Sequence, residues 1–293
     1  MELLRSLLFI PADSPRKMAK ARTLRPDAFI FDLEDAVPLD KKLEARKALA
    51  GELASAPDFA ARVFVRVNGA RSEFFDSDLR EIVHPRVDGI LFPKCADEAE
   101  VVRADQKIWQ LENEKGITEG KTRLVLILET ALGVVRAYEL ARSSPRIIAL
   151  NFGAEDYCAD MGVSRTASGD EVAVARSLVA QAAHAARLEA IDTVFTDFRD
   201  DAGLFLETRR IKQMGFTGKV LIHPNQIEPV HRAFAPTAEE MEWATHVIKA
   251  FEAAKAAGSA VVAVGGKMVD EPVVLQARRI LQQREANTSV RNR

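Results

Sequence analysis

Charged side chains of the kinds that bind cations and anions follow several short apolar runs of the sequence. Glu34 and Asp35 follow one run, Arg66 ends another, and Glu129 and Asp156 follow two more. If these runs are strands that end at one rim, the carboxylates repel one another until a hard divalent cation such as Mg²⁺ or Mn²⁺ binds them. Arg66 then offers a guanidinium fork to a substrate carboxylate. The pattern predicts a metal centre that binds a carboxylate.

Each of these residues also has a purely structural interpretation. A lone Asp or Glu after a strand is often the N-cap of the next helix, but Arg66, Lys94 and Glu129 are poor capping residues. Zinc is the alternative metal, and the sequence holds five histidines. No two of them lie at i, i+4 with a glutamate between, and only His223 follows an apolar run. An oxygen-bound ion is therefore favoured over Zn²⁺.

The elements that must position these residues alternate between short apolar runs and amphipathic stretches. The predicted strands are residues 6–11, 28–33, 63–67, 89–93, 124–128, 147–152, 193–195 and 220–222. The predicted helices between them include residues 41–53, 97–111, 134–141, 171–188 and 205–214. Most runs are apolar on both faces, as parallel strands covered on both sides are. Eight such units predict a closed (β/α)8 TIM barrel, whose active site lies at the carboxyl ends of the strands.

A doubly wound open sheet is the alternative architecture. It is disfavoured because no G-x-G-x-x-G turn follows any predicted strand. We assign residues 1–235 to the barrel and residues 236–293 to a C-terminal helical extension. This extension is predicted to contain a helix at 239–258, a glycine-rich turn at 264–270 and a helix from Pro272.

Composition excludes several classes of protein. The 293 residues are 47% hydrophobic and 29% charged, the balance of a globular chain with a substantial core. A formal net charge of −2 and few aromatic residues argue against a dedicated nucleic-acid binder. No run approaches 18 apolar residues, so no membrane span is expected. The N-terminus is too short and acidic for a secretory signal, and two cysteines cannot form a disulfide framework. We expect a cytoplasmic protein.

Seven short stretches stand at or near the predicted strand ends and in the C-terminal extension. They are RSLLFIP (5–11), FDLEDAV (31–37), VRVN (65–68), LET (128–130), FGAED (152–156), IHPNQ (222–226) and GKMVD (266–270). In order and placement they resemble the citrate lyase β-subunit-like group of the HpcH/HpaI aldolase superfamily. The resemblance spans nearly the whole chain. It implies a carbon–carbon lyase that cleaves or forms a 3-hydroxyacyl thioester of coenzyme A, such as malyl-CoA or citramalyl-CoA, with a 2-oxo acid as the second product.

The resemblance also implies roles for individual residues. Glu129 and Asp156 are implied to be the direct Mg²⁺ ligands, with water in the remaining positions. Glu34 and Asp35 are implied to orient those waters. Arg66 is implied to bind the carboxylate of the 2-oxo acid. The metal would act as a Lewis acid on the hydroxyl that becomes a carbonyl.

Two further positions complete the expected site, the first on physical grounds and the second from the resemblance. Main-chain N–H groups around Gly153 are expected to bind substrate and to add to charge stabilisation. Asp270 is implied to come from a neighbouring subunit, to cover the site and to move the proton on the α-carbon of the thioester. The homo-oligomer is then expected to be a trimer or a pair of trimers. The structural alternative for Asp270 is a cap of the helix that begins near Pro272.

A basic cluster near the first predicted strand is the candidate site for the phosphates of coenzyme A. Arg16, Lys17 and Lys20 lie just after the loop that opens a helix there, and a helix N-terminus with basic side chains suits phosphate. A solvated basic helix face is the structural alternative. Lys94 can serve the metal site or the phosphates.

Other functions within and outside this family remain open. One is the β subunit of a citrate lyase, whose citryl thioester is carried on an acyl carrier protein. Another is a 4-hydroxy-2-oxo acid aldolase that needs no thioester, and a third is a scaffold subunit without activity. The joint presence of Arg66, Glu129, Asp156 and Asp270 argues against the scaffold. The basic cluster and the Asp270 stretch favour a thioester substrate.

Overall fold

The computed structural model describes residues 4–55 and 59–291 of the chain. Two compact units make it up, one of Leu4–His231 and one that begins at Arg232. The division lies close to the boundary proposed after residue 235. Each unit is described by itself below.

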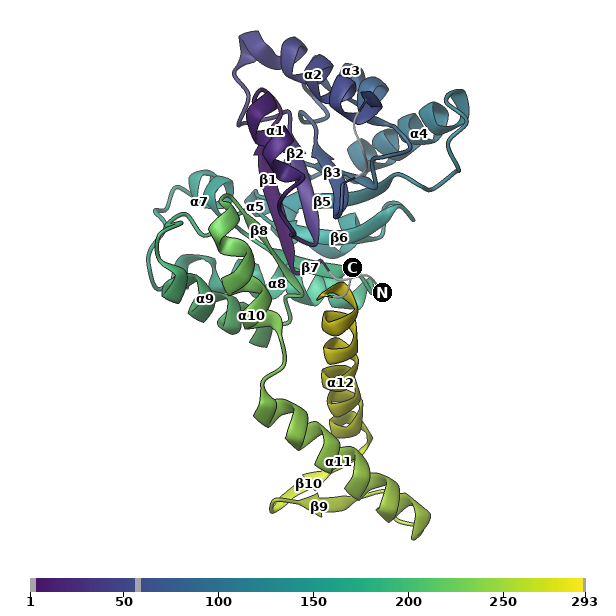
Figure 1. The fold of residues 1–293 in the computed structure, drawn as a ribbon, viewed down its shortest axis with the longest axis vertical. Helices are drawn as coiled ribbons and strands as arrows, with labels where there is room; N and C mark the ends of the chain where they lie inside the picture. Colours follow the sequence, from purple (N-terminus) through teal and green to yellow (C-terminus); the bar gives the residue numbers. More distant parts are fainter. Residues whose placement is uncertain (1–3, 56–58, 292–293) are drawn as a thin grey trace. The chain divides into compact units, whose positions relative to one another are not determined.

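The first unit is a closed barrel of eight parallel strands in sequential order (Figure 1). The strands are β1 (Ser6–Pro11), β2 (Ala28–Asp32), β3 (Arg62–Arg66), β4 (Gly89–Phe92), β5 (Arg123–Leu128), β6 (Ile147–Phe152), β7 (Glu189–Asp192) and β8 (Gly218–Leu221). Strand β8 pairs with β1 and closes the barrel, with Val220 opposite Leu7. The seam requires Gly218, because a Cβ there would lie 1.8 Å from the Leu4 carbonyl oxygen. The predicted TIM barrel is confirmed.

Helices surround this barrel and follow its strands. They are α1 (Pro15–Ala21), α2 (Lys42–Ser55), α3 (Phe75–Ile82), α4 (Glu98–Glu114), α5 (Ala131–Val135), α6 (Ala137–Ala141), α7 (Ala154–Met161), α8 (Asp170–Ala185), α9 (Asp201–Gln213) and α10 (Ile227–Phe234), with 3₁₀ turns η1 (Leu39–Lys41) and η2 (Pro224–Gln226). Side-chain caps start several of them: Asp97 accepts from Ala99, and Thr130 accepts from Gly133. The helix predicted at 134–141 is divided, since α5 and α6 meet at Arg136.

The seventh strand is the element that the sequence pattern placed wrongly. Residues 193–195 were predicted, whereas β7 is Glu189–Asp192. The error arose because the four-residue strand begins and ends with a charged residue, Glu189 and Asp192. The Asp192 carboxylate is fully buried and accepts hydrogen bonds from Arg176 Nε at 2.8 Å and Lys219 Nζ at 2.7 Å. A buried charge of this kind is tolerated only when it is paired, which single-strand patterning does not reveal.

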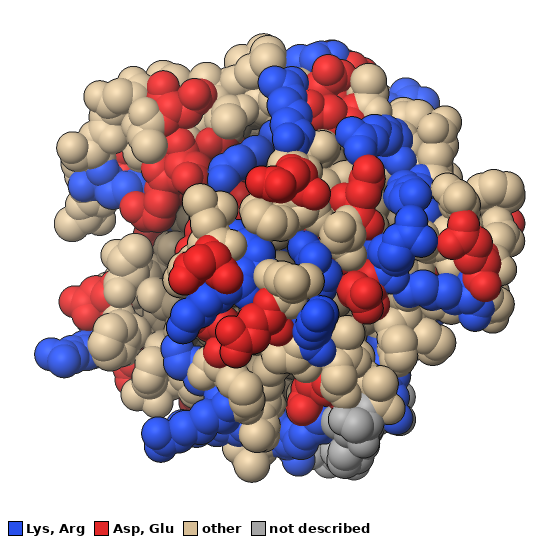
Figure 2. Space-filling model, turned by 90° about the horizontal axis from the view of Figure 1, so that it is seen from above, with Lys and Arg blue, Asp and Glu red and all other residues tan. Residues whose placement is uncertain are grey.

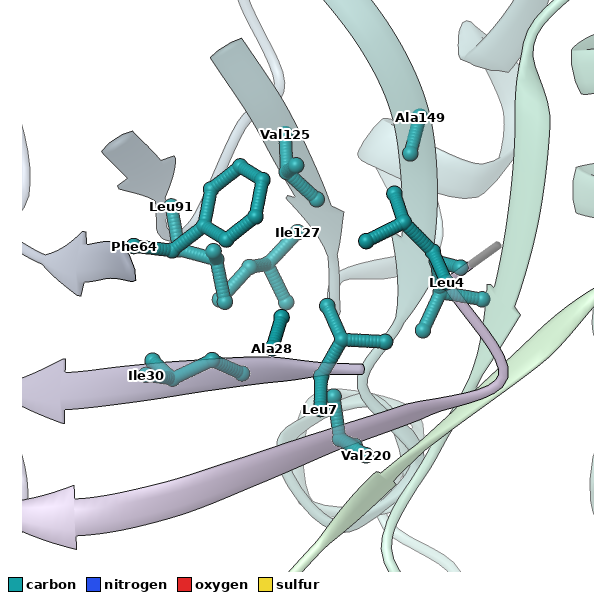
Figure 3. Packing of buried hydrophobic residues seen from close by; sticks show 11 residues of the cluster. Leu4, Leu7, Ala28, Ile30, Phe64, Leu91, Val125, Ile127, Ala149 and Val220 are labelled. Carbon is teal, nitrogen blue, oxygen red and sulfur yellow. The ribbon is translucent and has the colours of Figure 1, made fainter. Parts of the chain in front are cut away.

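The barrel interior is filled by side chains from alternate positions of the strands, which point toward one another (Figure 3). The cluster is Leu4, Leu7, Ala28, Ile30, Phe64, Leu91, Val125, Ile127, Ala149, Ile191 and Val220. Successive residues of a strand face opposite sides, so every second residue of a strand enters the barrel. This phase decides which residues stand above the cluster at the carboxyl ends.

The second unit has its own small core. It contains α11 (Ala238–Ala256), β9 (Val262–Val264), β10 (Lys267–Val269) and α12 (Glu271–Arg291). Val247 and Phe251 of α11 pack with Val269 and Val274. The predicted glycine-rich turn is the tip of an antiparallel hairpin, whose two short strands were not predicted. The helical character of the extension is confirmed.

The molecular surface gives two further observations. On the face drawn in Figure 2, Lys and Arg side chains are interspersed with Asp and Glu. Among the described residues, no helix is both long enough and apolar enough to cross a membrane.

Candidate active site

The polar residues of the barrel mouth stand in the same strand phase as the apolar cluster beneath them. Ile30 is followed two residues later by Asp32, Phe64 by Arg66, and Ile127 by Glu129. A period of two therefore places these charged groups inside the barrel, directly above its core. The carboxyl ends of parallel strands in this fold form the active-site face.

A cavity of ≈ 330 Å³ lies above the cluster. Its lining is Phe9, Pro11, Lys17, Asp32, Ala36, Arg66, Ile127, Glu129, Asn151, Phe152, Gly153, Ala154, Glu155, Asp156, Thr193, Val194, Val220 and Ile222. Carboxylates outnumber cations in this wall, since Lys17 and Arg66 are its only basic residues. Such an excess of negative charge around a small cavity suits a divalent cation and a small anionic substrate.

Arg66 is held by the strand beside it. Its Nε and Nη2 atoms donate to the two carboxylate oxygens of Asp32 at 2.8 and 2.6 Å, and its Nη1 lies 3.1 Å from Glu34 Oε2. The guanidinium also lies 4.8 Å from the centroid of the Phe9 ring. Burial alone would lower the pKa of Arg66, but the hydrogen bonds and charge of Asp32, with Glu34, outweigh burial and raise it. The group is thus held in one position and stays permanently charged.

The loop after β2 is fixed by buried polar contacts. Asp32 accepts hydrogen bonds from the main-chain N–H of Glu34 and of Ala36. From the other side, Lys42 Nζ donates to the carbonyl oxygens of Leu33 and Glu34 at 2.8 and 2.6 Å. These contacts give Glu34 one position at the rim, where it is 5% exposed.

Glu129 is the most strongly perturbed carboxyl group of the cavity. It is 2% exposed and its Oε1 accepts the main-chain N–H of Lys94 at 2.7 Å. Gly153 passes so close that a Cβ there would lie 2.7 Å from Glu129 Cβ, so a side chain at this position would displace the carboxylate. Burial, and then the charges of Asp156 and Glu34, raise the pKa of Glu129 to about 8. Repulsion of this kind is what a bound cation relieves.

The donor set of the cavity is consistent with a magnesium ion. Glu34 Oε2 is a buried oxygen that accepts no hydrogen bond from the described residues, although Arg66 Nη1 lies 3.1 Å away, and Glu129 and Asp156 face the same cavity. Within the described ranges no three His, Cys, Asp or Glu side chains converge as a ready ligand set. Two carboxylates that face one cavity suit Mg²⁺, which keeps several waters and is bound through one or two carboxylates.

We expect Glu129→Gln to stabilise the metal-free protein, increasingly so as the pH rises. The pKa of Glu129 is about 8 in the folded protein and 4.5 ordinarily. As the pH rises, the carboxyl group therefore loses its proton in the unfolded chain before it does so in the folded one, and the free energy of unfolding of the wild type falls between pH 4.5 and pH 8. Glutamine does not titrate. The free energy of unfolding of the variant, relative to that of the wild type, should therefore increase by roughly 1–3 kcal/mol across this range. Chemical denaturation in EDTA measures it.

Glu112 provides the matched control for this measurement. It is also fully buried, but hydrogen bonds from Arg146, Thr122 and Gly120 outweigh burial and lower the pKa of its carboxyl. Glu112→Gln should therefore destabilise the protein, with a smaller penalty at low pH. Equal shifts in one direction for both variants would contradict the assignment of Glu129 to a repulsive site.

The remaining predicted residues lie in different settings. Gly153 and Asp156 line the cavity, but the Gly153 N–H already donates to the Leu128 carbonyl oxygen at 3.0 Å. Any main-chain donor for substrate must therefore come from a neighbouring residue. Asp35 is exposed and lies 3.4 Å from Arg66 Nη1. In the second unit, Asp270 accepts from the Val273 N–H at 3.5 Å and so stands at the N-terminus of α12.

The basic cluster lies on α1. Arg16, Lys17 and Lys20 are all exposed, and Lys17 reaches the wall of the cavity.

Four polar residues of the cavity were not assigned roles from the sequence: Glu155, in the first turn of α7, and three that continue the inward-facing strand positions. These three are Asp32, which holds Arg66, and Asn151 and Thr193, which bridge β6, β7 and α7 through the Ile191 carbonyl oxygen and the Ala154 N–H. The signal that marks these three is the strand phase, because each lies two residues beyond a member of the apolar cluster.

The model of one protein family, HpcH/HpaI aldolase/citrate lyase, matches residues 5–224. The chain belongs to this family. The predicted resemblance is thereby confirmed, and the matched region contains every strand of the barrel. The stretch that holds Asp270 lies beyond the region that the family model covers.

The similarity to individual relatives covers the second unit as well. The citrate lyase subunit beta of Leuconostoc mesenteroides subsp. cremoris is 40% identical over 285 residues, covering 97% of this chain and 94% of the relative. A (3S)-malyl-CoA thioesterase of Cereibacter sphaeroides is 36% identical and covers 98% and 96%. Protein CitE from Mycobacterium tuberculosis, solved in complex with magnesium, acetoacetate and coenzyme A, is 32% identical with a TM-score of 0.79, covering 96% of this chain and 98% of that one.

Proposed function

We propose that this protein is a Mg²⁺-dependent carbon–carbon lyase that acts on a 3-hydroxyacyl-CoA thioester such as malyl-CoA or citramalyl-CoA. The observation that carries the proposal is the joint presence of Arg66, Glu129 and Asp156 in one cavity above the barrel core. Its ≈ 330 Å³ suit a small 2-oxo acid. The magnesium and coenzyme A bound by CitE support the same reaction class. Mn²⁺ is the alternative ion.

Each residue of the site has its own proposed role in bond cleavage. The bond between the α- and β-carbons breaks, the β-hydroxyl gives up its proton and becomes the carbonyl of the 2-oxo acid, and the thioester leaves as an enolate that takes up a proton. Arg66 would hold the carboxylate of the acid. Glu129 and Asp156 would hold Mg²⁺, which supplies Lewis-acid stabilisation of the reacting oxygen. Glu34 and Asp35 would orient the waters of the ion.

The α-carbon proton is assigned to Asp270 of a neighbouring subunit, and the enzyme is proposed to be a homotrimer or hexamer. Arg16, Lys17 and Lys20 would bind the phosphates of coenzyme A. The exposure of all three supports contact with a large ligand outside the barrel.

Two other substrate arrangements have specific support. The 40% identity to a citrate lyase subunit beta favours a citryl thioester carried on an acyl carrier protein. The malyl-CoA thioesterase relative favours hydrolysis of the thioester instead of carbon–carbon cleavage. A free 4-hydroxy-2-oxo acid aldolase has less support, because it leaves the basic cluster without a role.

A product assay separates these functions. The purified protein is incubated with malyl-, citramalyl- and citryl-CoA, each with Mg²⁺ and with EDTA, and free thiol and 2-oxo acid are measured together. A CoA lyase releases the 2-oxo acid without free CoA, and only with metal. Free CoA without 2-oxo acid indicates a thioesterase. Inactivity on all three, with activity on the citryl carrier protein, indicates the citrate lyase subunit.

We expect Arg66→Lys to raise the KM for the 2-oxo acid in the condensation direction by roughly 10–100-fold, because lysine keeps the charge but loses the fork. The substitution also leaves Asp32 with fewer donors, so a thermal melt must accompany the kinetics. Wild-type KM in a folded lysine variant would rule out the clamp.

A further inference from the structure

Lys94 contacts two carboxylates of the site through two different groups. Its main-chain N–H donates to Glu129 Oε1 at 2.7 Å, and its Nζ donates to Glu34 Oε1 at 2.6 Å. Nζ also lies 3.6 Å from Asp35 Oδ1. The side chain is 48% exposed on the wall of a second cavity of ≈ 640 Å³, so solvent and ions reach it.

The backbone at Lys94 has an unusual conformation that serves the first of these contacts. Its φ of +54° is in the left-handed region, which costs a non-glycine residue about 1 kcal/mol or more. Neighbouring contacts hold the chain there. The Cys95 N–H donates to the Ile127 carbonyl oxygen, and Gly133 packs so closely that a Cβ would lie 2.3 Å from the Cys95 carbonyl oxygen. The turn thus aims the Lys94 N–H at Glu129.

The positive charge of the Lys94 side chain partly neutralises the carboxylates that are expected to surround the metal ion. Glu34, Asp35 and Glu129 all contribute to raising the pKa of the Lys94 ammonium, against burial, which alone would lower it. An ammonium among these carboxylates stabilises the metal-free cluster. The same positive charge repels an arriving divalent cation.

We propose that Lys94 is a positioning residue that sets the affinity of the site for its divalent cation. Its ammonium is the resident counter-charge of the metal-free site and holds Glu34 in place, while its N–H fixes Glu129. The inference rests on the proposed function, because it takes Mg²⁺ as the ion. It requires that loss of the ammonium strengthens Mg²⁺ binding and yet lowers turnover, since the Glu34 side chain then keeps, among the described residues, only its contact with Arg66 and is held less firmly. A merely structural lysine would weaken both.

The test measures Mg²⁺ binding by isothermal titration calorimetry without substrate. Lys94→Met removes the charge and keeps the strained backbone, and Lys94→Gly removes both. Both variants should bind Mg²⁺ roughly three- to tenfold more tightly than wild type, and Lys94→Arg should stay within about twofold. In EDTA, Lys94→Gly should melt at a higher temperature than Lys94→Met, because glycine accepts the positive φ.

Lys121 is the matched control. It forms a half-buried ion pair with Asp88 at 2.8 Å, before strands β4 and β5 and so at the opposite end of the barrel. Lys121→Met should leave Mg²⁺ affinity unchanged. Unchanged or weaker Mg²⁺ binding in both Lys94→Met and Lys94→Gly overturns the proposal, as does equal tightening in Lys121→Met. If wild type binds no Mg²⁺ at millimolar concentration, the proposed metal-dependent function itself fails, which is a distinct result.

Discussion

Glu129→Gln is expected to lower kcat by at least about 10³-fold while the barrel stays folded. The amide keeps the size of the side chain but loses the negative charge that a magnesium ligand needs. Because Glu129 is buried under repulsion from Asp156 and Glu34, the fold does not depend on that charge. Steady-state kinetics at saturating Mg²⁺, together with a thermal melt, measure the two effects separately.

Glu129→Asp is the companion variant. It keeps a carboxylate but withdraws it by one methylene, so activity should lie between wild type and Glu129→Gln, with a higher Mg²⁺ requirement. Calorimetry should detect little Mg²⁺ binding to Glu129→Gln. Near-normal kcat in a glutamine variant would remove Glu129 from the metal centre.

Asp270→Asn is the second variant expected to lose most of its activity, roughly 10²–10³-fold, in line with removal of a general acid or base. If Asp270 serves the site of a neighbouring subunit, mixing Asp270→Asn with Glu129→Gln and allowing subunits to reassemble should restore activity. Some sites in the mixed oligomer then combine an intact Glu129 with an intact Asp270. The measurement is kcat per total subunit before and after exchange.

Lack of recovery, despite subunit exchange proven by native mass spectrometry, would assign Asp270 to its own chain or to a structural role. The hydrogen bond from the Val273 N–H shows what that structural role is, because Asp270 caps α12. Asp270→Ser retains a capping side chain without a titratable group. It should keep the thermal stability of wild type and lose activity as Asp270→Asn does.

The barrel could be predicted from the sequence because most of its strands are apolar on both faces and each is followed by a helix. The position of strand β7 was not predicted, because a charged residue such as Asp192 is typical of a loop. Only the structure shows that Arg176 and Lys219 pair with it. The hairpin of β9 and β10 was not predicted, because each of its strands has only three residues. Short strands carry too few positions for an alternation to register.

The sequence predicted which residues belong to the candidate site, but not how their side chains are paired. Glu129, Asp156 and Arg66 stand where strands end, and all three face one cavity. What the sequence could not supply is the partner of each group. The pairing of Arg66 with Asp32 and the Lys94 N–H on Glu129 depend on register between strands and on a left-handed turn. Neither can be inferred from the types of the residues alone.

The stacking of a polar layer on an apolar cluster inside one barrel has an evolutionary consequence. Ile222 lines the cavity and is 42% exposed, whereas the cluster below is buried. Substitution of a partly exposed residue costs little stability, so a lineage can exchange Ile222 for smaller or larger residues and alter the space in the cavity. Drift at such a position needs no compensating change in the packed layer. If the cavity binds the 2-oxo acid as proposed, divergence among acids of different size is open to this scaffold in single mutational steps.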